Sequence, residues 1–471
     1  MAVIQSAERL LPAGLRGKAE PLVRALASDD PRNRAQRMAL ITFAIRVVSA
    51  AIAFISQIIL ARVMGEFEYG IFVFVWALVV ICGDLSCLGF HTTVVRFLPD
   101  YAGRNAHAEI RGLTSTARIF AMLSSTALAG LGFLCLWLFH GVFADYYVVP
   151  LFVGLFCMPM IALGDVLDST ARAHSWALVA LSPTYIIRPL LILAFMALAV
   201  LLGEPHTALT AMVAALAATY LTTVVQFASI VRRLGKRYVA GPRKREFALW
   251  IKAALPIFVI EGFGFLLTNS DVIVVGLFLD PESVAIYFAA AKTMALVHFV
   301  FFSVKAAAAP RFSALFSSGD RVALARFAGE TVRWSFWPSL AVGLGVLALG
   351  HFLLSLFGPA FTAGHGLMAI LFTGILAKAL VGPGEVLLTM SGEQRLCVAV
   401  YAVALSANIA LNVTLIPLFG VTGAAIATAS AMVLEAVLLH IAVRGKLSII
   451  LFAFANPVKA SLINGMDHHD R

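Results

Sequence analysis

Twelve apolar runs of about 20 residues, separated by short polar turns, dominate this chain. A helix rises about 1.5 Å per residue, so each run can cross the roughly 30 Å hydrocarbon core of a bilayer. In hydrocarbon, only a helix pairs all its backbone groups within one segment. The sequence therefore predicts an all-α polytopic membrane protein with about 12 transmembrane helices. The runs cover residues 38–62, 69–90, 115–139, 147–167, 176–202, 207–231, 249–279, 284–306, 334–357, 365–390, 396–418 and 421–443.

The composition agrees with this prediction. Hydrophobic residues make up 61% of the 471 residues and charged residues only 13%, which lies far outside the usage of soluble domains. The net charge of +10 is explained by basic loops beside an anionic membrane surface, so no nucleic-acid partner is expected.

Lysine and arginine predict the orientation, because cytoplasmic loops retain them during insertion. The six turns on one side of the predicted membrane carry none of these residues, whereas the segments on the other side carry 29 of the 35. Both termini are therefore expected in the cytoplasm. The basic segments are 1–37, 91–118, 168–175, 232–252, 307–333, 391–396 and 444–471.

Three of the predicted outer hairpins recur at a displacement of 215 to 218 residues, which indicates duplication of a six-helix unit. Two such units enter the bilayer the same way up, so we expect two six-helix bundles related by a pseudo-two-fold axis around a central cavity. Chance similarity between hydrophobic hairpins is the alternative explanation. The pairs are 59–72 with 274–287, 136–144 with 354–362, and Gly203 with Gly420.

The predicted organisation follows from the spans and the duplication. The five parts are an N-terminal cytoplasmic tail (1–37), an N-lobe (38–231), a basic cytoplasmic inter-lobe loop (232–248), a C-lobe (249–443) and a C-terminal cytoplasmic tail (444–471).

Basic residues inside the apolar runs are the strongest candidates for a binding site. Each costs about 2.5–3.5 kcal/mol on insertion, so it is expected to face water, a ligand or a partner. Arg62 and Lys305 lie near span ends, where their side chains can reach the membrane surface. The deeper ones could contact a ligand or form structural ion pairs: Arg46, Arg188, Lys292 and Lys378.

Two helix faces extend this candidate site. One stripe of polar and small residues at helical spacing would be wasted against lipid; it consists of Thr42, Arg46, Ser49, Ala53, Ser56 and Gln57.

In the second half, Lys378, Gly382 and Glu385 share a face, and the sequence VGPGE (381–385) is expected to kink the helix. Broken helices at mid-depth often mark substrate sites in transporters.

Acidic residues within the runs are candidates for binding a coupling proton or sodium ion: Glu261, Asp271 and Glu385. The chain has no GxxxxGK[ST] loop and no HExxH motif, and its five cysteines lack metal-ligand spacing. The sequence therefore predicts a transporter without a cofactor or metal site, not an enzyme.

Two long stretches resemble the polysaccharide transporters (Wzx-type flippases and exporters) of the multidrug/oligosaccharidyl-lipid/polysaccharide (MOP) exporter superfamily. Residues 56–101, beginning SQIILARVMGEFEYG, are similar to the family's early signature, and residues 388–429 to its late signature. The matching positions are Arg62, Gly65, Tyr69, Gly70, Gly89 and Arg96, and then Gly392, Asn408, Asn412, Pro417, Gly420, Gly423, Ala424 and Ala425.

This resemblance implies a monomeric flippase or exporter of the bacterial inner membrane. It would move an undecaprenyl-diphosphate-linked oligosaccharide for exopolysaccharide, capsule or O-antigen synthesis by alternating access. A polysaccharide polymerase and glycosyltransferases are the partners it implies. The buried basic residues suit such a substrate, because arginine makes charge-assisted contacts to a diphosphate.

Two other functions remain open at this stage. A cation-coupled multidrug exporter of the same superfamily would also have two six-helix lobes, and Glu261 and Asp271 fit it. A non-transporting membrane scaffold could recruit partners through the basic loops, but it would have no use for charges inside the membrane.

Overall fold

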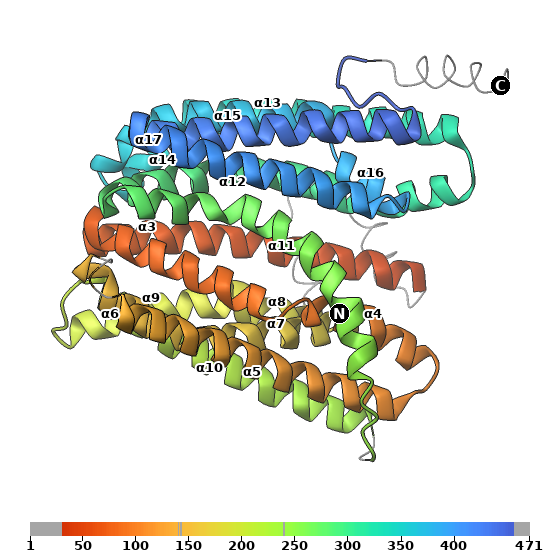
Figure 1. Ribbon diagram of the computed structural model, residues 1–471, viewed down its shortest axis with the longest axis horizontal. Coiled ribbons are helices and arrows are strands. Elements are labelled where there is room, and N and C mark those ends of the chain that lie inside the picture. Colours follow the sequence, from red (N-terminus) through yellow and green to blue (C-terminus); the bar gives the residue numbers. More distant parts are fainter. Residues whose placement is uncertain (1–30, 140, 142–143, 239–240, 456–471) are drawn as a thin grey trace, which may run out of the picture.

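The computed structural model describes residues 31–139, 141, 144–238 and 241–455 (Figure 1). Most of the predicted N-terminal tail and the end of the predicted C-terminal tail lie outside these residues. Every regular element within the described ranges is helical, which confirms the predicted fold class.

The described residues of the first half of the chain form nine helical elements. They are α3 (Pro31–Ser86), α4 (Phe90–Gly103), α5 (His107–Leu138), α6 (Asp145–Leu155), α7 (Met158–Ala173), α8 (Ala177–Ser182), the π-helix η2 (Pro183–Ile187), α9 (Arg188–Leu201) and α10 (Ala208–Arg237).

The second half, as far as Ala455, forms eight more. They are α11 (Phe247–Phe278), α12 (Pro281–Ser317), α13 (Arg321–Ala348), α14 (Gly350–Phe357), the 3-10 helix η3 (Ala360–Gly364), α15 (His365–Val381), α16 (Gly384–Met390) and α17 (Gln394–Leu447).

The described helices account for twelve spans. Eight are long and apolar enough to cross a membrane, or ten when each bent pair, α6 with α7 and α13 with α14, counts as one span. Two of the eight reverse direction at a glycine and each contain two spans: α3 at Gly65 (φ 78°) and α17 at Gly420 (φ 57°). Glycine adopts such a positive φ without the steric cost that a Cβ imposes.

The spans form two bundles in the view of Figure 1. The elements from α12 to α17 lie above, those from α5 to α10 lie below, and α3 and α11 run between them. We call the two halves of the molecule the N-lobe and the C-lobe, as predicted.

The apolar core joins the two lobes mainly near the predicted outer turns. One cluster combines N-lobe residues such as Tyr69 and Phe72 with C-lobe residues such as Tyr287 and Phe361. The three other clusters of the described chain belong to the inner halves. Two lie in the N-lobe and one in the C-lobe, and only the first half of α11, through Trp250, packs on the opposite lobe.

Two contacts hold the outer ends together. A Cβ on Gly70 would lie 1.8 Å from the carbonyl oxygen of Pro281, so only glycine lets these two hairpins approach so closely. Arg62 donates from Nε to the carbonyl of Leu356 (2.6 Å) and from Nη2 to that of Ser355. Its side chain thus binds the C-lobe and does not simply extend toward the membrane surface as expected.

The segment between the lobes is tied down at its inner end. Helix α10 continues to Arg237, and α11 begins at Phe247. Between them the Lys244 ammonium contacts Glu246 (2.9 Å) and Glu109 (3.1 Å). The hydrogen bond from Lys244 lowers the pKa of the Glu246 carboxyl.

Candidate functional site

Arg46 lies between the two lobes. Its guanidinium carbon is 5.1 Å from the ring centre of Tyr185 in η2 and 5.4 Å from that of Phe302 in α12. No carboxylate among the described residues lies within ion-pairing distance of it. The arginine is therefore held by one aromatic ring from each lobe and not by an ion pair with a described residue.

Arg188 lies on the N-lobe side, at the end of a π-helical turn. Its N–H bonds to the carbonyl of Pro183, five residues earlier. Pro189 has no N–H to complete an α-helical bond to Tyr185, so the sequence PTYIIRP favours this wider turn. The guanidinium lies 6.0 Å from the Trp76 ring centre, and Asp165 and Asp168 interact with its charge from beyond ion-pairing distance.

Lys292 is exposed although it lies within the long apolar helix α12. Its ammonium is 5.1 Å from the ring centre of Phe288, and that ring packs on Tyr69 of the opposite lobe. Asp271 in α11 interacts with its charge, but no carboxylate of the described chain forms an ion pair with it. An exposed ammonium at this depth, next to the lobe interface, is available to an anion.

Lys378 is part of an ion pair. Its Nζ lies 2.8 and 2.9 Å from the two carboxylate oxygens of Glu435, whose side chain is 1% exposed. This geometry favours a structural ion pair, and not direct contact with a ligand, as the role of Lys378.

Glu385 is paired as well, with Lys305 and with the Tyr401 hydroxyl. Lys305 and Lys378 share the Phe301 ring, at 5.4 and 6.0 Å from its centre. The predicted kink is present, since α15 ends at Val381 and α16 begins at Gly384. Glu385 on α16 thereby reaches Lys305 on α12, and not Lys378 on α15, the helix before the kink.

His298 lies among the three C-lobe lysines. Lys292, Lys305 and Lys378 all interact with its ring electrostatically. We call these four residues the C-lobe basic cluster. Glu385 and Glu435 balance two of the lysines, which leaves Lys292 as the lysine without an ion-pair partner among the described residues.

Gln57 and Asp271 each accept a hydrogen bond from a buried tyrosine of their own lobe. The Tyr69 hydroxyl donates to Gln57 Oε1 at 2.9 Å, and the Tyr287 hydroxyl donates to Asp271 Oδ2 at 2.8 Å. The buried Asp271 carboxylate also accepts from the backbone N–H of Val272 (2.9 Å), and Tyr287 shares a hydrogen bond with Thr428 (3.1 Å). The C-lobe arrangement holds a carboxylate where the N-lobe holds a neutral amide.

Glu261 connects the lobes on the inner side. It accepts a hydrogen bond from Thr92 Oγ1 at 2.6 Å and lies 3.3 Å from His91 Nε2. Its side chain is 47% exposed. This carboxylate is thus shared between α11 and α4 and is reachable by solvent.

Sequence reasoning missed several residues of this region. Tyr185, Phe302 and His298 carry no charge signal, and aromatic residues are common in apolar helices. Two prolines six residues apart, at Pro183 and Pro189, were the available sign of an unusual turn.

The sequence models of two protein families match parts of this chain. The sequence model of the family described as polysaccharide biosynthesis protein matches residues 36–316, more than half of the chain, and that of MatE matches residues 256–414. No curated protein sequence matches the chain.

Several solved structures share the fold. An inward-facing MATE family multidrug resistance transporter of the MOP superfamily has a TM-score of 0.70 at 12% identity, covering 85% of this chain and 94% of that one. The lipid II flippase MurJ, in an inward closed conformation, has a TM-score of 0.70 at 14% identity, covering 92% and 91%. A MOP superfamily transporter from Pyrococcus furiosus Vc1 has a TM-score of 0.63 at 15% identity, covering 90% and 97%.

Two six-span lobes joined at their outer ends define a class of multi-pass membrane protein whose fold is shared with transporters of the MOP superfamily. Within this class, the chain belongs to the polysaccharide biosynthesis protein family.

Proposed function

We propose that this protein flips an undecaprenyl-diphosphate-linked oligosaccharide across the bacterial inner membrane, with both termini in the cytoplasm. The position of Arg46 carries the proposal, since an arginine without an ion-pair partner among the described residues lies between rings of both lobes. A diphosphate brings at least two negative charges, and arginine binds such groups with paired hydrogen bonds.

Lys292 would supply the second contact to the diphosphate. It is exposed near the lobe interface, while Lys378 is already neutralised by Glu435. Arg188 and Gln57 would lie toward the N-lobe, where sugars can bond to polar groups. The polymerase and glycosyltransferases that build the glycan are the partners this function requires.

A monovalent cation would drive the cycle through Asp271. Of the three acidic candidates, Glu385 is paired with Lys305 and Glu261 joins the lobes through Thr92 and His91. Asp271 keeps its carboxylate buried and bonded to the Tyr287 hydroxyl, which in turn shares a hydrogen bond with the Thr428 hydroxyl. Sodium prefers such oxygen ligands, and a proton can bind the same carboxylate.

Multidrug export is the second candidate, favoured by the MatE match over residues 256–414 and by the half-exposed Glu261 between the lobes. A carboxylate reachable from solvent suits a cationic drug. The scaffold hypothesis has no comparable observation in its favour.

Transport in proteoliposomes distinguishes the two candidates. We would compare a fluorescent polyprenyl-diphosphate oligosaccharide with a cationic dye, in the wild type and in Arg46→Ala. Arg311→Ala is a matched control, because Arg311 also lies over a ring, that of Phe327 (4.4 Å), but outside the lobe interface. We expect selective movement of the lipid-linked sugar, lost in Arg46→Ala and kept in Arg311→Ala. Dye efflux that depends on Glu261 and not on Arg46 would contradict the flippase proposal.

A further inference from the structure

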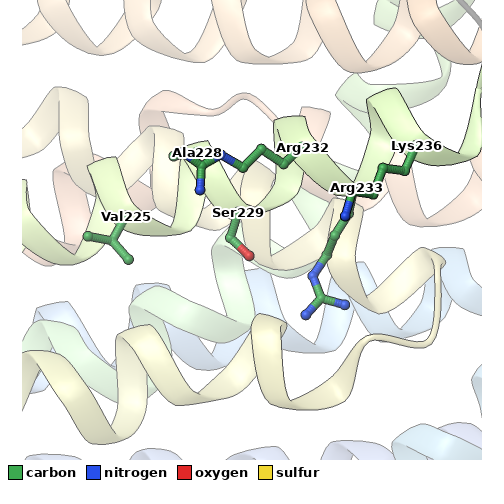
Figure 2. A pocket seen from close by; sticks show the side chains of 6 residues that line it. All are labelled: Val225, Ala228, Ser229, Arg232, Arg233 and Lys236. Carbon is green, nitrogen blue, oxygen red and sulfur yellow. The ribbon is translucent and has the colours of Figure 1, made fainter.

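A basic groove lies on the inner end of α10, apart from the site between the lobes. It encloses about 670 Å³ and is lined by Val225, Ala228, Ser229, Arg232, Arg233 and Lys236. Figure 2 shows the Arg232 guanidinium beside Ala228, while Ser229 and Arg233 point toward the neighbouring segment. Helix α10 packs against α6, α7 and α9 of its own lobe, and Figure 1 shows it at the edge of the N-lobe away from the C-lobe.

The three cations of this groove have no carboxylate partner among the described residues. Some other basic residues on the same predicted side of the membrane do have one: Arg104 pairs with Asp100, Lys244 with Glu109 and Glu246, and Lys446 with Glu393. Three unbalanced positive charges within two helical turns repel one another. A bound anion would remove that repulsion.

Aromatic and apolar side chains continue the groove in both directions. The Arg233 guanidinium carbon lies 5.5 Å from the ring centre of Trp176, at the start of α8. Tryptophan is typical of the membrane interface, so it marks the level of the lipid headgroups. Toward the membrane centre, Leu221, Val224 and Val225 leave about half of their side-chain surface exposed. A ligand that fits both parts has an anionic head and apolar chains.

We infer that this groove binds an anionic phospholipid of the cytoplasmic leaflet. Its phosphodiester would contact Arg232, Arg233 and Lys236, and its acyl chains would lie along Val225 and the apolar surface beyond. Basic grooves between membrane helices on the cytoplasmic side recognise phospholipid headgroups in this way. The inference concerns the membrane around the protein and holds whichever substrate the lobes carry.

Binding of defined lipids to the purified full chain tests this inference. Detergent micelles would carry phosphatidylglycerol, cardiolipin or phosphatidylcholine, and native mass spectrometry would count the lipids retained. We expect retention of the anionic lipids and not of phosphatidylcholine, with affinity falling as salt rises. Removing all three charges, in Arg232→Gln/Arg233→Gln/Lys236→Gln, should weaken binding on the order of 100-fold, and Arg232→Gln alone about 5-fold.

A charge-matched control separates the groove from general attraction. Arg321, Arg326 and Arg333 lie exposed on α13, on the same predicted side of the membrane. Changing these three to glutamine should leave lipid retention at the wild-type level. Equal loss in both triple variants, or no loss in either, would overturn the inference.

Competition between two lipids tests whether the groove binds the phosphate of a membrane phospholipid or that of the proposed substrate. Undecaprenyl diphosphate would be added alone and in competition with phosphatidylglycerol. Preference for phosphatidylglycerol at the groove supports the inference. Displacement of phosphatidylglycerol by undecaprenyl diphosphate, lost in the α10 triple variant, would make the groove a substrate entry site and overturn it.

Discussion

The two lobes repeat the same hairpin but hold charge in different ways. In the N-lobe, Tyr69 donates to the neutral amide of Gln57, and Arg46 and Arg188 lie over aromatic rings. In the C-lobe, Tyr287 donates to the carboxylate of Asp271, and Lys305 and Lys378 pair with carboxylates.

We infer from this difference that the two lobes of the duplicated fold have different roles in binding an anion and a cation. Arginines oriented by rings keep their charge for an anion, while a buried carboxylate can take up a cation. In the proposed function, Arg46 of the N-lobe would bind the diphosphate together with Lys292 of the C-lobe, and Asp271 of the C-lobe would bind the coupling ion.

Removing the C-lobe carboxylate should have the largest effect. We expect Asp271→Asn to abolish the dependence of transport on the cation gradient and to lower its rate about 100-fold, at the upper end of typical coupling between linked sites. Transport against sodium and proton gradients in proteoliposomes measures both. Gln57→Ala, which removes the acceptor of the Tyr69 hydroxyl in the N-lobe, should keep cation dependence. If it is lost there instead, the assignment of tasks is reversed.

Breaking a C-lobe ion pair should come next. Glu435→Ala leaves Lys378 without its partner at a site where the carboxylate is 1% exposed, so we expect a loss of stability of about 3 kcal/mol. Arg188→Gln, which removes an arginine held by a ring, should cost about 1 kcal/mol. Denaturant unfolding in detergent compares the two. The double change Glu435→Ala/Lys378→Ala should recover part of the loss, and equal costs for both single changes would remove the contrast between the lobes.

The paired tyrosines give a closer comparison. Tyr287→Phe removes a hydrogen bond to a carboxylate and should cost about 2 kcal/mol, whereas Tyr69→Phe removes one to an amide and should cost about 1 kcal/mol. Tyr69 and Tyr287 are both fully buried, so burial does not explain a difference between the two stability losses. The same unfolding measurement applies. A larger cost for Tyr69→Phe would show that Asp271 is protonated and neutral.

The contact between the outer ends should have the smallest effect. Arg62→Gln removes the bonds to Ser355 and Leu356 and should weaken the contact by about 1 kcal/mol, because the side chain is exposed. The outward-open population would then rise about 5-fold. Spin labels at Phe67 and Phe352 can measure that population by their separation. Arg62→Lys keeps the charge and serves as the control; no change in Arg62→Gln would show that the apolar cluster alone joins the lobes.

Much of the architecture could be predicted because the membrane restricts the choices. Twelve apolar runs have to be helices in the membrane. The turns at Gly65 and Gly420, each in a different pair of repeated hairpins, indicated where the chain reverses. The kink near Gly382 could also be predicted from the sequence, because Pro383 cannot continue a helix.

The candidate functional site could be predicted from the sequence only in part. Depth in the membrane selected Lys292 and Lys378 equally, yet Lys378 pairs with Glu435, 57 residues away in sequence, and Lys292 has no such partner among the described residues. Lys305 of α12, judged to reach the membrane surface, pairs with Glu385 of α16, just after the kink. Helical spacing predicts neighbours on one helix and not across helices.

The sequence by itself determined that the chain crosses the membrane as helices, where it turns and which residues carry charge inside the bilayer, because these properties follow from the cost of burying polar groups in hydrocarbon. Only the tertiary structure decided which of those charges are neutralised. That depends on how α12, α15 and α17 pack against one another, and a carboxylate within 3 Å changes what a lysine can bind.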